Sequence, residues 1–430
     1  MTDPAVVDPR TGSGAGAGAP KGLDLDRLAA HLAVHRPELA GAPLRARLIA
    51  GGKSNLTYLL RCGEHATGRA GGQAGTPAHG QATGREVVLR RPPLGHVLAT
   101  AHDMAREHRI ISALAPTAVP VPAALLLCTD TGVIGAPFYL MEKVDGEVFR
   151  SRSQTDALTA GQRRDLAMTM VDTLADLHAV DPAAVGLADF GRPEGFLGRQ
   201  VRRWAGQLDQ SRSRPLPGID ELRDALAGSV PEGANAGRIV HGDYRLDNLL
   251  ATVDTTTATT ADGAAPATGA TTTATAAGAA AGTTAAGADG APLEGATAAA
   301  GPGAVSVRAV LDWEMATLGD PLADLGLLLT YWDVLGDSEA AAGNPVADGL
   351  GPRAGFPTGG ELIERYARRA DADVGPLHWH VALGCFKLAV ICEGIHYRHT
   401  LGQTLGGGFD RIGDMVAPLV EHGLRAVREK

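Results

Sequence analysis

One motif of eight residues constrains this chain more than any other feature of its sequence. Residues 241–248 read His-Gly-Asp-Tyr-Arg-Leu-Asp-Asn, so Asn248 follows Asp243 by five positions, and Asp312 follows the strand-like run 305–311. Phosphoryl transfer needs one carboxylate to orient and deprotonate the attacking hydroxyl, and two oxygen ligands to hold Mg²⁺ against the phosphates. The spacing equals that of the kinase motif H-R-D-x-x-x-x-N, with glycine in place of arginine. The sequence therefore predicts a phosphoryl-transfer site, and an ordinary turn at 241–243 is the structural alternative.

These motifs resemble those of the aminoglycoside phosphotransferase family of small-molecule kinases. The resemblance rests on residues 241–248, 311–314 and 319–325 and runs from Leu48 to the C-terminus. Residues 51–58 and 393–398 are most similar to the branch that includes kinase-like domains fused to acyl-CoA dehydrogenases. The family implies an α+β, bilobal, protein-kinase-like fold, with an antiparallel sheet in a small N-lobe and a mainly helical C-lobe. It also implies ATP and Mg²⁺ as cofactors and a small-molecule hydroxyl as the acceptor.

Composition predicts three polar segments outside the folded lobes. Residues 1–21 are rich in Gly, Ala and Pro, residues 63–85 in Gly, Ala, Thr and His, and residues 251–304 in Ala, Thr and Gly. Such segments bury too little apolar surface to offset the entropy lost on ordering. We therefore expect a disordered tail at 1–21, an N-lobe at 22–145 with an insertion at 63–85, and a C-lobe at 146–430 with a disordered insertion at 251–304. A substrate lid or docking tail is the functional alternative for the last segment.

Charge and hydropathy disfavour two classes of partner. The net charge is −9, whereas broad nucleic-acid binding needs a basic surface that releases counterions. No apolar run has the length needed to span a bilayer, and the acidic, Pro-containing start of the chain differs from a signal peptide. We expect a cytoplasmic protein with neither a nucleic-acid nor a membrane partner; the sequence is silent on a protein partner.

A kinase also needs a cation on the third strand, oriented by a helix glutamate, to hold the phosphates of the nucleotide. Residues 87–90 match Val-Ala-Ile-Lys in pattern but end in Arg90, and the helix-like segment 104–114 offers Glu107. Arginine still binds phosphate, often bidentately, although it is bulkier than lysine. Arg91 is a competing candidate, and a surface arginine that closes a strand is the structural alternative.

Two further segments are expected to contact the nucleotide. Residues 51–54 contain Gly-Lys-Ser, but a Walker A loop needs glycine at position 47, which is Arg, and a helix where a strand-like run follows. A glycine-rich turn between two strands fits better, with backbone N–H groups and the Ser54 hydroxyl near the phosphates. By the family resemblance, the strand-like run 138–142, which ends in Glu142, is the linker between the lobes, where backbone groups meet adenine.

The catalytic-side residues are expected to take separate roles. Asp243 is the candidate base and orienter of the hydroxyl. Asn248 and Asp312 are the candidate Mg²⁺ ligands, with Asp312 bridging the β- and γ-phosphates as its family counterpart does. Positioning and charge neutralisation should supply most of the rate. His241 is expected to support the loop by hydrogen bonding, with direct acid–base chemistry as the alternative.

Three more carboxylates follow in the sequence. Asp320 and Asp324 resemble the supporting carboxylates of the family, which would brace the catalytic loop and start the next helix. Asp320 before Pro321 also has the pattern of a helix N-cap followed by proline, which is the structural interpretation. Glu314 stands where protein kinases have glycine; it either adds a carboxylate to the metal site or replaces the glycine structurally, and the sequence leaves this open.

The segments expected on the substrate side carry two basic clusters. The clusters consist of Arg199, Arg202, Arg203 and Trp204, and of Lys387, His396, Arg398 and His399. Basic groups suit a carboxylate or phosphate, whereas polycationic aminoglycosides need acidic pockets. Together with the branch resemblance, this predicts a hydroxy acid or hydroxyacyl thioester as acceptor, bound by Arg202, Arg203, Lys387, His396 and Arg398. A solvated basic face is the structural alternative; an aminoglycoside or macrolide kinase and a catalytically silent nucleotide-binding scaffold are the functional ones.

Overall fold

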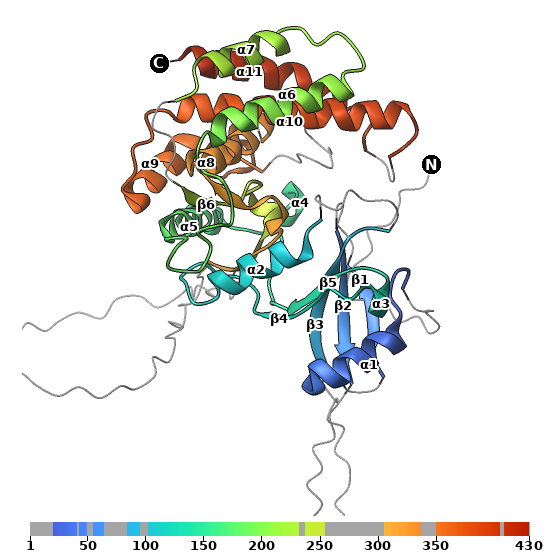
Figure 1. Ribbon diagram of the computed structural model, residues 1–430. Coiled ribbons are helices and arrows are strands. Elements are labelled where there is room, and N and C mark those ends of the chain that lie inside the picture. The colour runs from blue at the N-terminus through green and yellow to red at the C-terminus, as the bar shows by residue number, and fades with distance from the viewer. Residues whose placement is uncertain are drawn as a thin grey trace, which may run out of the picture.

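The computed structural model shows two lobes that meet at a cleft (Figure 1). It describes residues 20–40, 43–49, 55–63, 84–94, 102–231, 237–253, 305–336, 350–404 and 408–429. The predicted tail and both predicted insertions fall mostly outside these ranges. None of the described helices combines the length and the apolar character that crossing a membrane requires.

The N-lobe is built on a five-stranded antiparallel sheet with the strand order β1-β2-β3-β5-β4. Its elements are α1 (Leu25–His35), β1 (Arg45–Leu48), β2 (Leu56–Cys62), β3 (Arg85–Arg91), α2 (Met104–Leu114), β4 (Ala124–Cys128), α3 (Thr131–Ile134) and β5 (Phe138–Glu142). Helix α1 starts at Asp24, whose carboxylate accepts a hydrogen bond from the N–H of Arg27, and it buries Leu28 and Leu32 in a core shared with the sheet. The leucine spacing in 25–32 predicts this helix, and the runs at 44–49, 56–61 and 86–90 fall on the first three strands.

The C-lobe is mainly helical. Its helices are α4 (Arg152–Thr155), α5 (Ala160–Ala179), α6 (Phe196–Ser211), α7 (Ile219–Gly228), α8 (Leu322–Leu329), α9 (Gly359–Ala370), α10 (Leu377–Thr400) and α11 (Val416–Arg428), and its strands are β6 (Arg238–Val240), β7 (Leu249–Val253), β8 (Val305–Val310) and β9 (Thr317–Gly319). Single-turn helical segments lie at Pro37–Leu39, Leu246–Asn248, Trp313–Met315, Thr330–Leu335, Pro352–Ala354 and Ile412–Met415. The expected fold class, α+β with a bilobal kinase-like arrangement, is confirmed.

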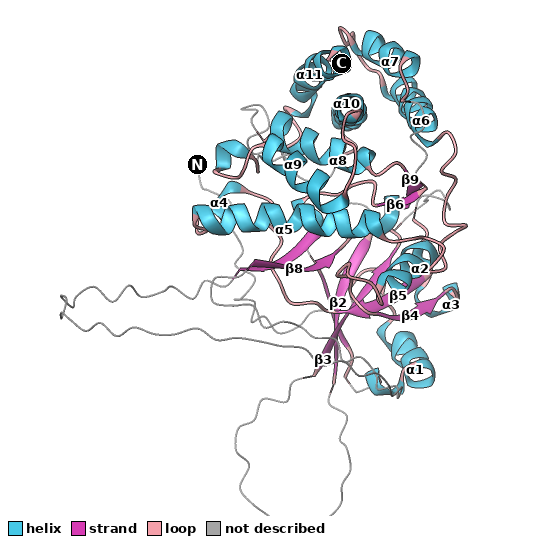
Figure 2. Ribbon diagram, turned by 90° about the vertical axis from the view of Figure 1, so that its left-hand side faces the viewer, coloured by secondary structure: helices cyan, strands magenta, loops and turns pink. Residues whose placement is uncertain are grey.

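Helix α5 lies between the β7–β8 hairpin and helix α9, as Figure 2 shows. It begins with a capping box formed by Thr159 and Gln162 and buries Leu166, Met170 and Leu174, which recur at helical spacing. Farther from the N-lobe, α10 is surrounded by α6, α7, α8 and α11. A helix enclosed in this way is apolar on most of its faces, so the polar side chains that α10 does carry need a specific reason.

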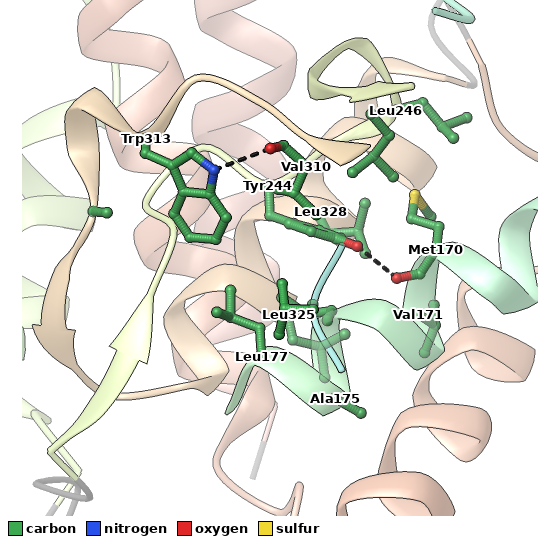
Figure 3. Packing of buried hydrophobic residues seen from close by; sticks show 14 of the residues in the cluster. Met170, Val171, Ala175, Leu177, Tyr244, Leu246, Val310, Trp313, Leu325 and Leu328 are labelled. Carbon is green, nitrogen blue, oxygen red and sulfur yellow. Dashed lines mark hydrogen bonds between the residues drawn. The ribbon is translucent and has the colours of Figure 1, made fainter. Parts of the chain in front are cut away.

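Two short antiparallel strand pairs place the predicted catalytic segments next to each other. Strand β6 pairs with β9, and β7 pairs with β8 so that Leu249 lies opposite Val310. The loop between β6 and β7 packs through Tyr244, whose hydroxyl donates to the carbonyl oxygen of Met170 at 2.7 Å (Figure 3). On the other side, the indole N–H of Trp313 donates to the carbonyl oxygen of Val310 at 3.0 Å. These buried anchors fix both loops to one core.

Candidate active site

The loop between β6 and β7 brings Asp243 and Asn248 into contact. The side-chain amide of Asn248 donates to the carbonyl oxygen of Asp243 at 2.8 Å and to its carboxylate at 3.2 Å. Gly242 has φ of +83°, and a Cβ at this position would lie 2.8 Å from the carbonyl oxygen of Met315. A side chain would be strained there, so the loop requires glycine where the protein-kinase motif has arginine.

Asp324, on helix α8, holds this loop through hydrogen bonds to its backbone. Its carboxylate accepts hydrogen bonds from the backbone N–H groups of His241 at 2.6 Å and of Gly242 at 2.8 Å, and His178 Nε2 lies 3.3 Å away. Burial alone would raise the pKa of Asp324, but the neighbouring His178 and His241 outweigh burial and lower it. The carboxylate is therefore a fixed negative charge on the first turns of α8, at the position that the family resemblance implies for a supporting residue.

His241 and Asp320 have separate structural contacts. The Nδ1 atom of His241 accepts the N–H of Asp243 at 3.2 Å, so Nε2 carries the proton and donates to the carbonyl oxygen of Leu311 at 2.9 Å. Both ring nitrogens are engaged, which favours loop support over acid–base chemistry. Asp320 accepts the N–H of Leu322 at 2.9 Å and lies 3.3 Å from His380 Nε2, so it acts on the start of α8, as the N-cap interpretation predicts.

Asp312 follows β8 in the left-handed backbone region, with φ of 65° and ψ of 61°. Few residues other than glycine adopt this conformation, although aspartate is enriched among them, and it turns the carboxylate toward the N-lobe. Arg90 Nη2 donates to Asp312 Oδ1 at 2.8 Å, and Arg90 Nε lies 3.2 Å from Glu107 Oε2. Burial opposes the charge on Arg90, but Tyr139, Glu107 and Asp312 raise its pKa above the ordinary value. The third-strand cation thus contacts both the helix glutamate and the candidate metal ligand.

Arg91 faces the opposite side of the sheet. Its guanidinium donates to the carbonyl oxygens of Ile134, at 2.9 Å, and of Gly22. Successive residues of a strand alternate between faces, so Arg91 cannot share the cleft with Arg90. Of the two candidates that the sequence offers, Arg90 is therefore the one next to Asp312.

The cleft between the lobes has an apolar part and a polar part. It holds about 320 Å³. The apolar lining consists of Ile49, Leu59, Val88, Pro122, Met141, Val144, Val148, Leu250 and Leu311. The polar lining includes Arg47, Arg90, Glu142, Arg150, Asn248 and Asp312. A purine suits the first part and a polyphosphate the second. Glu142 stands at the end of β5 as predicted, whereas Ser54 lies outside the described residues.

The candidate metal ligands fit Mg²⁺ in chemistry. The side-chain amide nitrogen of Asn248 donates to Asp243, which leaves the amide oxygen for a cation. Arg90 donates to Oδ1 of Asp312, which leaves Oδ2 for the same purpose. The N–H of Leu311 donates to the carbonyl oxygen of Asn248 at 2.8 Å, so Asn248 lies beside the residue that precedes Asp312. Carboxylate and amide oxygens are the hard ligands that Mg²⁺ prefers.

A second hollow of about 530 Å³ lies next to Gly242, the residue before Asp243. It is bounded by α6, α10, the start of α2 and the segment 314–317, and the catalytic loop contributes Gly242 to its wall. Its charged lining consists of Arg106, Arg192, Arg199, Arg203 and Lys387 against Asp103, Glu314 and Asp324. The pocket therefore has more basic than acidic groups.

The two predicted basic clusters do not form as expected. Arg203 and Lys387 come from different clusters and line the same hollow, whereas Arg398 lines a separate hollow of about 360 Å³ between α6 and α10. Arg202 is exposed on another face of α6, and His396 lies against Gly413. The reason is helix geometry: adjacent residues point about 100° apart, and eleven residues span about 16 Å.

Glu314 connects the lobes. Its carboxylate accepts a hydrogen bond from the Asn55 side-chain amide at 3.1 Å, and the same amide donates to Glu107 at 2.8 Å. Glu314 also lies 3.9 Å from His102 Nδ1 and lines the second hollow. These contacts favour a structural role at the lobe interface over a second metal carboxylate.

Sequence reasoning missed several residues of the site. Tyr139 donates its hydroxyl to Glu107 at 3.0 Å, and Tyr331 donates to Asp243 Oδ1 at 3.5 Å while Arg245 stacks on its ring. His178, which pairs with Asp324, stands one position after the buried stripe of α5. A histidine next to the buried residues of a predicted helix indicates a polar contact in the core, so His178 could have been predicted from the sequence. Tyr139 and Tyr331 belong to no motif or spacing that would have identified them.

The chain matches a known protein family over more than half of its length. The model described as "Phosphotransferase enzyme family" matches residues 45–259 and 303–360. The chain belongs to this family. It is thus a phosphotransferase of the small-molecule kinase class. The residues between the two matched segments, 260–302, belong to the Ala/Thr/Gly-rich tract.

Curated relatives and solved structures agree with the family. Acyl-CoA dehydrogenase family member 11 of Gallus gallus is 29% identical over 396 residues, which cover 90% of this chain and 41% of that protein. Family member 10 of Mus musculus is 28% identical over 376 residues, covering 86% and 28%. This phosphotransferase family member thus spans less than half the length of these relatives.

Among solved structures, a Ralstonia eutropha JMP134 protein, provisionally assigned as an aminoglycoside phosphotransferase, is 27% identical with a TM-score of 0.66. The alignment covers 94% of this chain and 98% of that one. The GDP complex of aminoglycoside 2'-phosphotransferase-IIIa has 11% identity and a TM-score of 0.50, covers 94% and 99%, and shares the fold alone.

Proposed function

We propose that this family member transfers the γ-phosphoryl group of ATP to a hydroxyl of a small anionic acceptor, a hydroxy acid or a hydroxyacyl thioester. The observation that carries the proposal is the position of the loop that holds Asp243, whose neighbouring residues line two hollows. The loop contributes Asn248 to the cleft that suits a nucleotide and Gly242 to the basic hollow. A carboxylate between a phosphate donor and an acceptor is what in-line transfer requires.

Each residue then has a defined task. Asn248 and Asp312 hold Mg²⁺, which neutralises charge on the phosphates when it is bound, and Arg90 holds the phosphate oxygens from the N-lobe side. The Asp243 carboxylate orients the acceptor hydroxyl and takes its proton as the new O–P bond forms and ADP leaves. Asp324, His241 and Glu107 touch neither reactant; they hold the loop and Arg90 in place.

The charge of the second hollow favours an anionic acceptor over an aminoglycoside. A polycationic antibiotic needs free carboxylates, but Asp103 caps α2 through the N–H of Arg106, Asp324 holds the loop, and Glu314 accepts from Asn55. The names of the curated relatives, acyl-CoA dehydrogenase family members, point to acyl chemistry in the same direction.

The test is Mg-ATP consumption by wild type and by Asp243→Asn with hydroxyacyl-CoAs, free hydroxy acids, aminoglycosides and macrolides. We expect turnover only with acyl acceptors, and a loss of roughly 10²–10⁴-fold in the variant with unchanged thermal unfolding. Turnover restricted to an antibiotic would refute the acceptor class, and near-normal turnover of the variant would refute the role of Asp243. Binding of Mg-ATP without turnover of any acceptor, in the wild type as in the variant, would favour the catalytically silent nucleotide-binding scaffold.

A further inference from the structure

Lys387 is a polar exception on the enclosed helix α10. Its side chain is partly exposed to the basic hollow, and its Nζ donates to the carbonyl oxygen of Gly242 at 2.6 Å. Gly242 is bonded directly to Asp243, so this ammonium lies within one peptide unit of the candidate base. An ammonium has three N–H donors, and the loop carbonyl uses one of them.

The surroundings of Lys387 leave its charge without a close carboxylate. Within the described ranges, no carboxylate oxygen lies within 4.0 Å of its Nζ, because Asp324 is committed to His178 and the loop N–H groups. The ring of Trp204, on α6, covers one side at 5.5 Å, and a cation–π contact offsets only part of the desolvation of a cation.

The groups that face Lys387 pull its pKa in both directions. Burial, Arg203 and Arg245 lower the pKa, and the more distant carboxylates of Asp243 and Asp324 raise it without cancelling the effect of burial. A partly desolvated ammonium without a close carboxylate is stabilised by a bound anion, because the anion replaces the hydration that burial removed.

Three of the other cations of the hollow are engaged elsewhere. The Arg106 guanidinium donates to the carbonyl oxygens of Phe190 and, at 3.0 Å, Ala316, and that of Arg199 donates to those of Glu194 and Arg192. Arg203, one side chain along from Trp204, stacks on its ring at 5.6 Å. Of the cations that line the hollow, Lys387 is therefore the one that touches the catalytic loop and retains free donors.

We infer that Lys387 binds the acyl oxygen of the acceptor, a carboxylate or thioester carbonyl, and thereby selects acceptors whose reacting hydroxyl lies only a few carbons from that oxygen. The inference rests on the proposed function and makes it more specific. Nζ contacts the peptide group that joins Gly242 to Asp243. A short hydroxyacyl unit can therefore place its acyl oxygen at Nζ and its hydroxyl at Asp243, whereas an alcohol without an acyl oxygen meets only Asp243.

The experiment compares Lys387→Met, Lys387→Arg and the wild type on hydroxycarboxylates of two to six carbons, their coenzyme A thioesters, and diols of the same length. The control is Arg368→Met, an exposed cation on α9 that lines neither the cleft nor the basic hollow. We expect Lys387→Met to raise KM for short hydroxycarboxylates by about 10–100-fold, the range for a hydrogen bond to a charged group. The diols should show no change in KM, and Lys387→Arg should restore part of the loss. The thioesters should be affected less than the free acids, because their oxygen is uncharged.

A role limited to holding the Gly242 carbonyl predicts a different pattern. It lowers kcat for every acceptor, diols included, and leaves the ratio between hydroxycarboxylates and diols unchanged; that result would overturn the inference. Calorimetry of the same hydroxycarboxylates on Asp243→Asn, with and without Lys387→Met, gives a second readout that needs no turnover. Binding that depends on Lys387 supports the inference even if no acceptor is phosphorylated, and binding that is independent of Lys387 refutes it even if the enzyme is active.

Discussion

Replacing Arg90 with methionine isolates the buried ion pair of the N-lobe. The change keeps most of the side-chain volume and removes the charge that lies 3.2 Å from Glu107, whose side chain is 1% exposed. Removing one member of a buried pair costs about 3–5 kcal/mol, because the other charge remains buried. Glu107 keeps the amide of Asn55 at 2.8 Å and the hydroxyl of Tyr139 at 3.0 Å. We therefore expect a loss of about 2–3 kcal/mol at pH 8.

The pH dependence of that loss has a definite sign. Burial raises the pKa of Glu107 above its ordinary value of 4.5, and Arg90 opposes the rise. The Arg90→Met variant lacks the positive charge that lowers this pKa, so the folded-state pKa of Glu107 is higher in the variant than in the wild type. A carboxyl with a raised folded-state pKa is destabilising once ionised, so stability falls as the pH rises from the unfolded pKa through the folded one. The deficit of the variant should therefore be larger at pH 8 than at pH 5.

Urea unfolding followed by circular dichroism at both pH values measures the deficit. The matched control is Arg90→Met with Glu107→Gln, in which no buried charge is left; it should regain at least half of the loss at pH 8 and lose the pH dependence. A deficit that is the same at both pH values, or that the second substitution does not relieve, would refute the reasoning about Glu107.

Three further predictions follow from single contacts. Asp312→Ala should weaken Mg-ATP binding by at least tenfold without changing Mg-free nucleotide binding, as measured by calorimetry; equal affinities would exclude Asp312 as a metal ligand. Asp324→Asn should lower the free energy of unfolding by about 2–4 kcal/mol at pH 7. Because the folded-state pKa of Asp324 lies below the ordinary value of 3.8, this difference should shrink as the pH falls through the folded pKa; a difference that grows in acid would contradict the assignment. Gly242→Ala should destabilise the loop by about 1–3 kcal/mol through its positive φ and reduce turnover, and a fully active variant would show that the loop tolerates a side chain.

Much of the fold and of the site's frame is predictable because local patterns determine it. The leucine stripes of α1 and α5, the strand run before Asp312 and the spacing from Asp243 to Asn248 each report on residues that are close in sequence. The choice between Arg90 and Arg91 was open to the same logic, since strand alternation sends neighbouring residues to opposite faces.

The remainder depends on contacts between distant segments. The side chain of Asn55 donates hydrogen bonds to Glu107 and Glu314, which lie 52 and 259 positions away in the sequence. No periodic pattern in the sequence predicts a contact over such separations. The basic clusters were grouped by nearness in sequence, whereas α6 and α10 sort them by face and by distance along the axis. That is why Lys387 shares its hollow with Arg203 and not with Arg398.

The register of the β7–β8 hairpin has a consequence for engineering. Val253 pairs with Val305 at one end, while Leu249 pairs with Val310 next to Asn248 and Asp312 at the other. The two ends are separated by four residues of strand, or about 13 Å. Val253 and Val305 therefore lie opposite each other at the end of the hairpin that is remote from Asn248 and Asp312. We expect that deleting sequence, or fusing a reporter domain, between residues 253 and 305 preserves the geometry between Asn248 and Asp312.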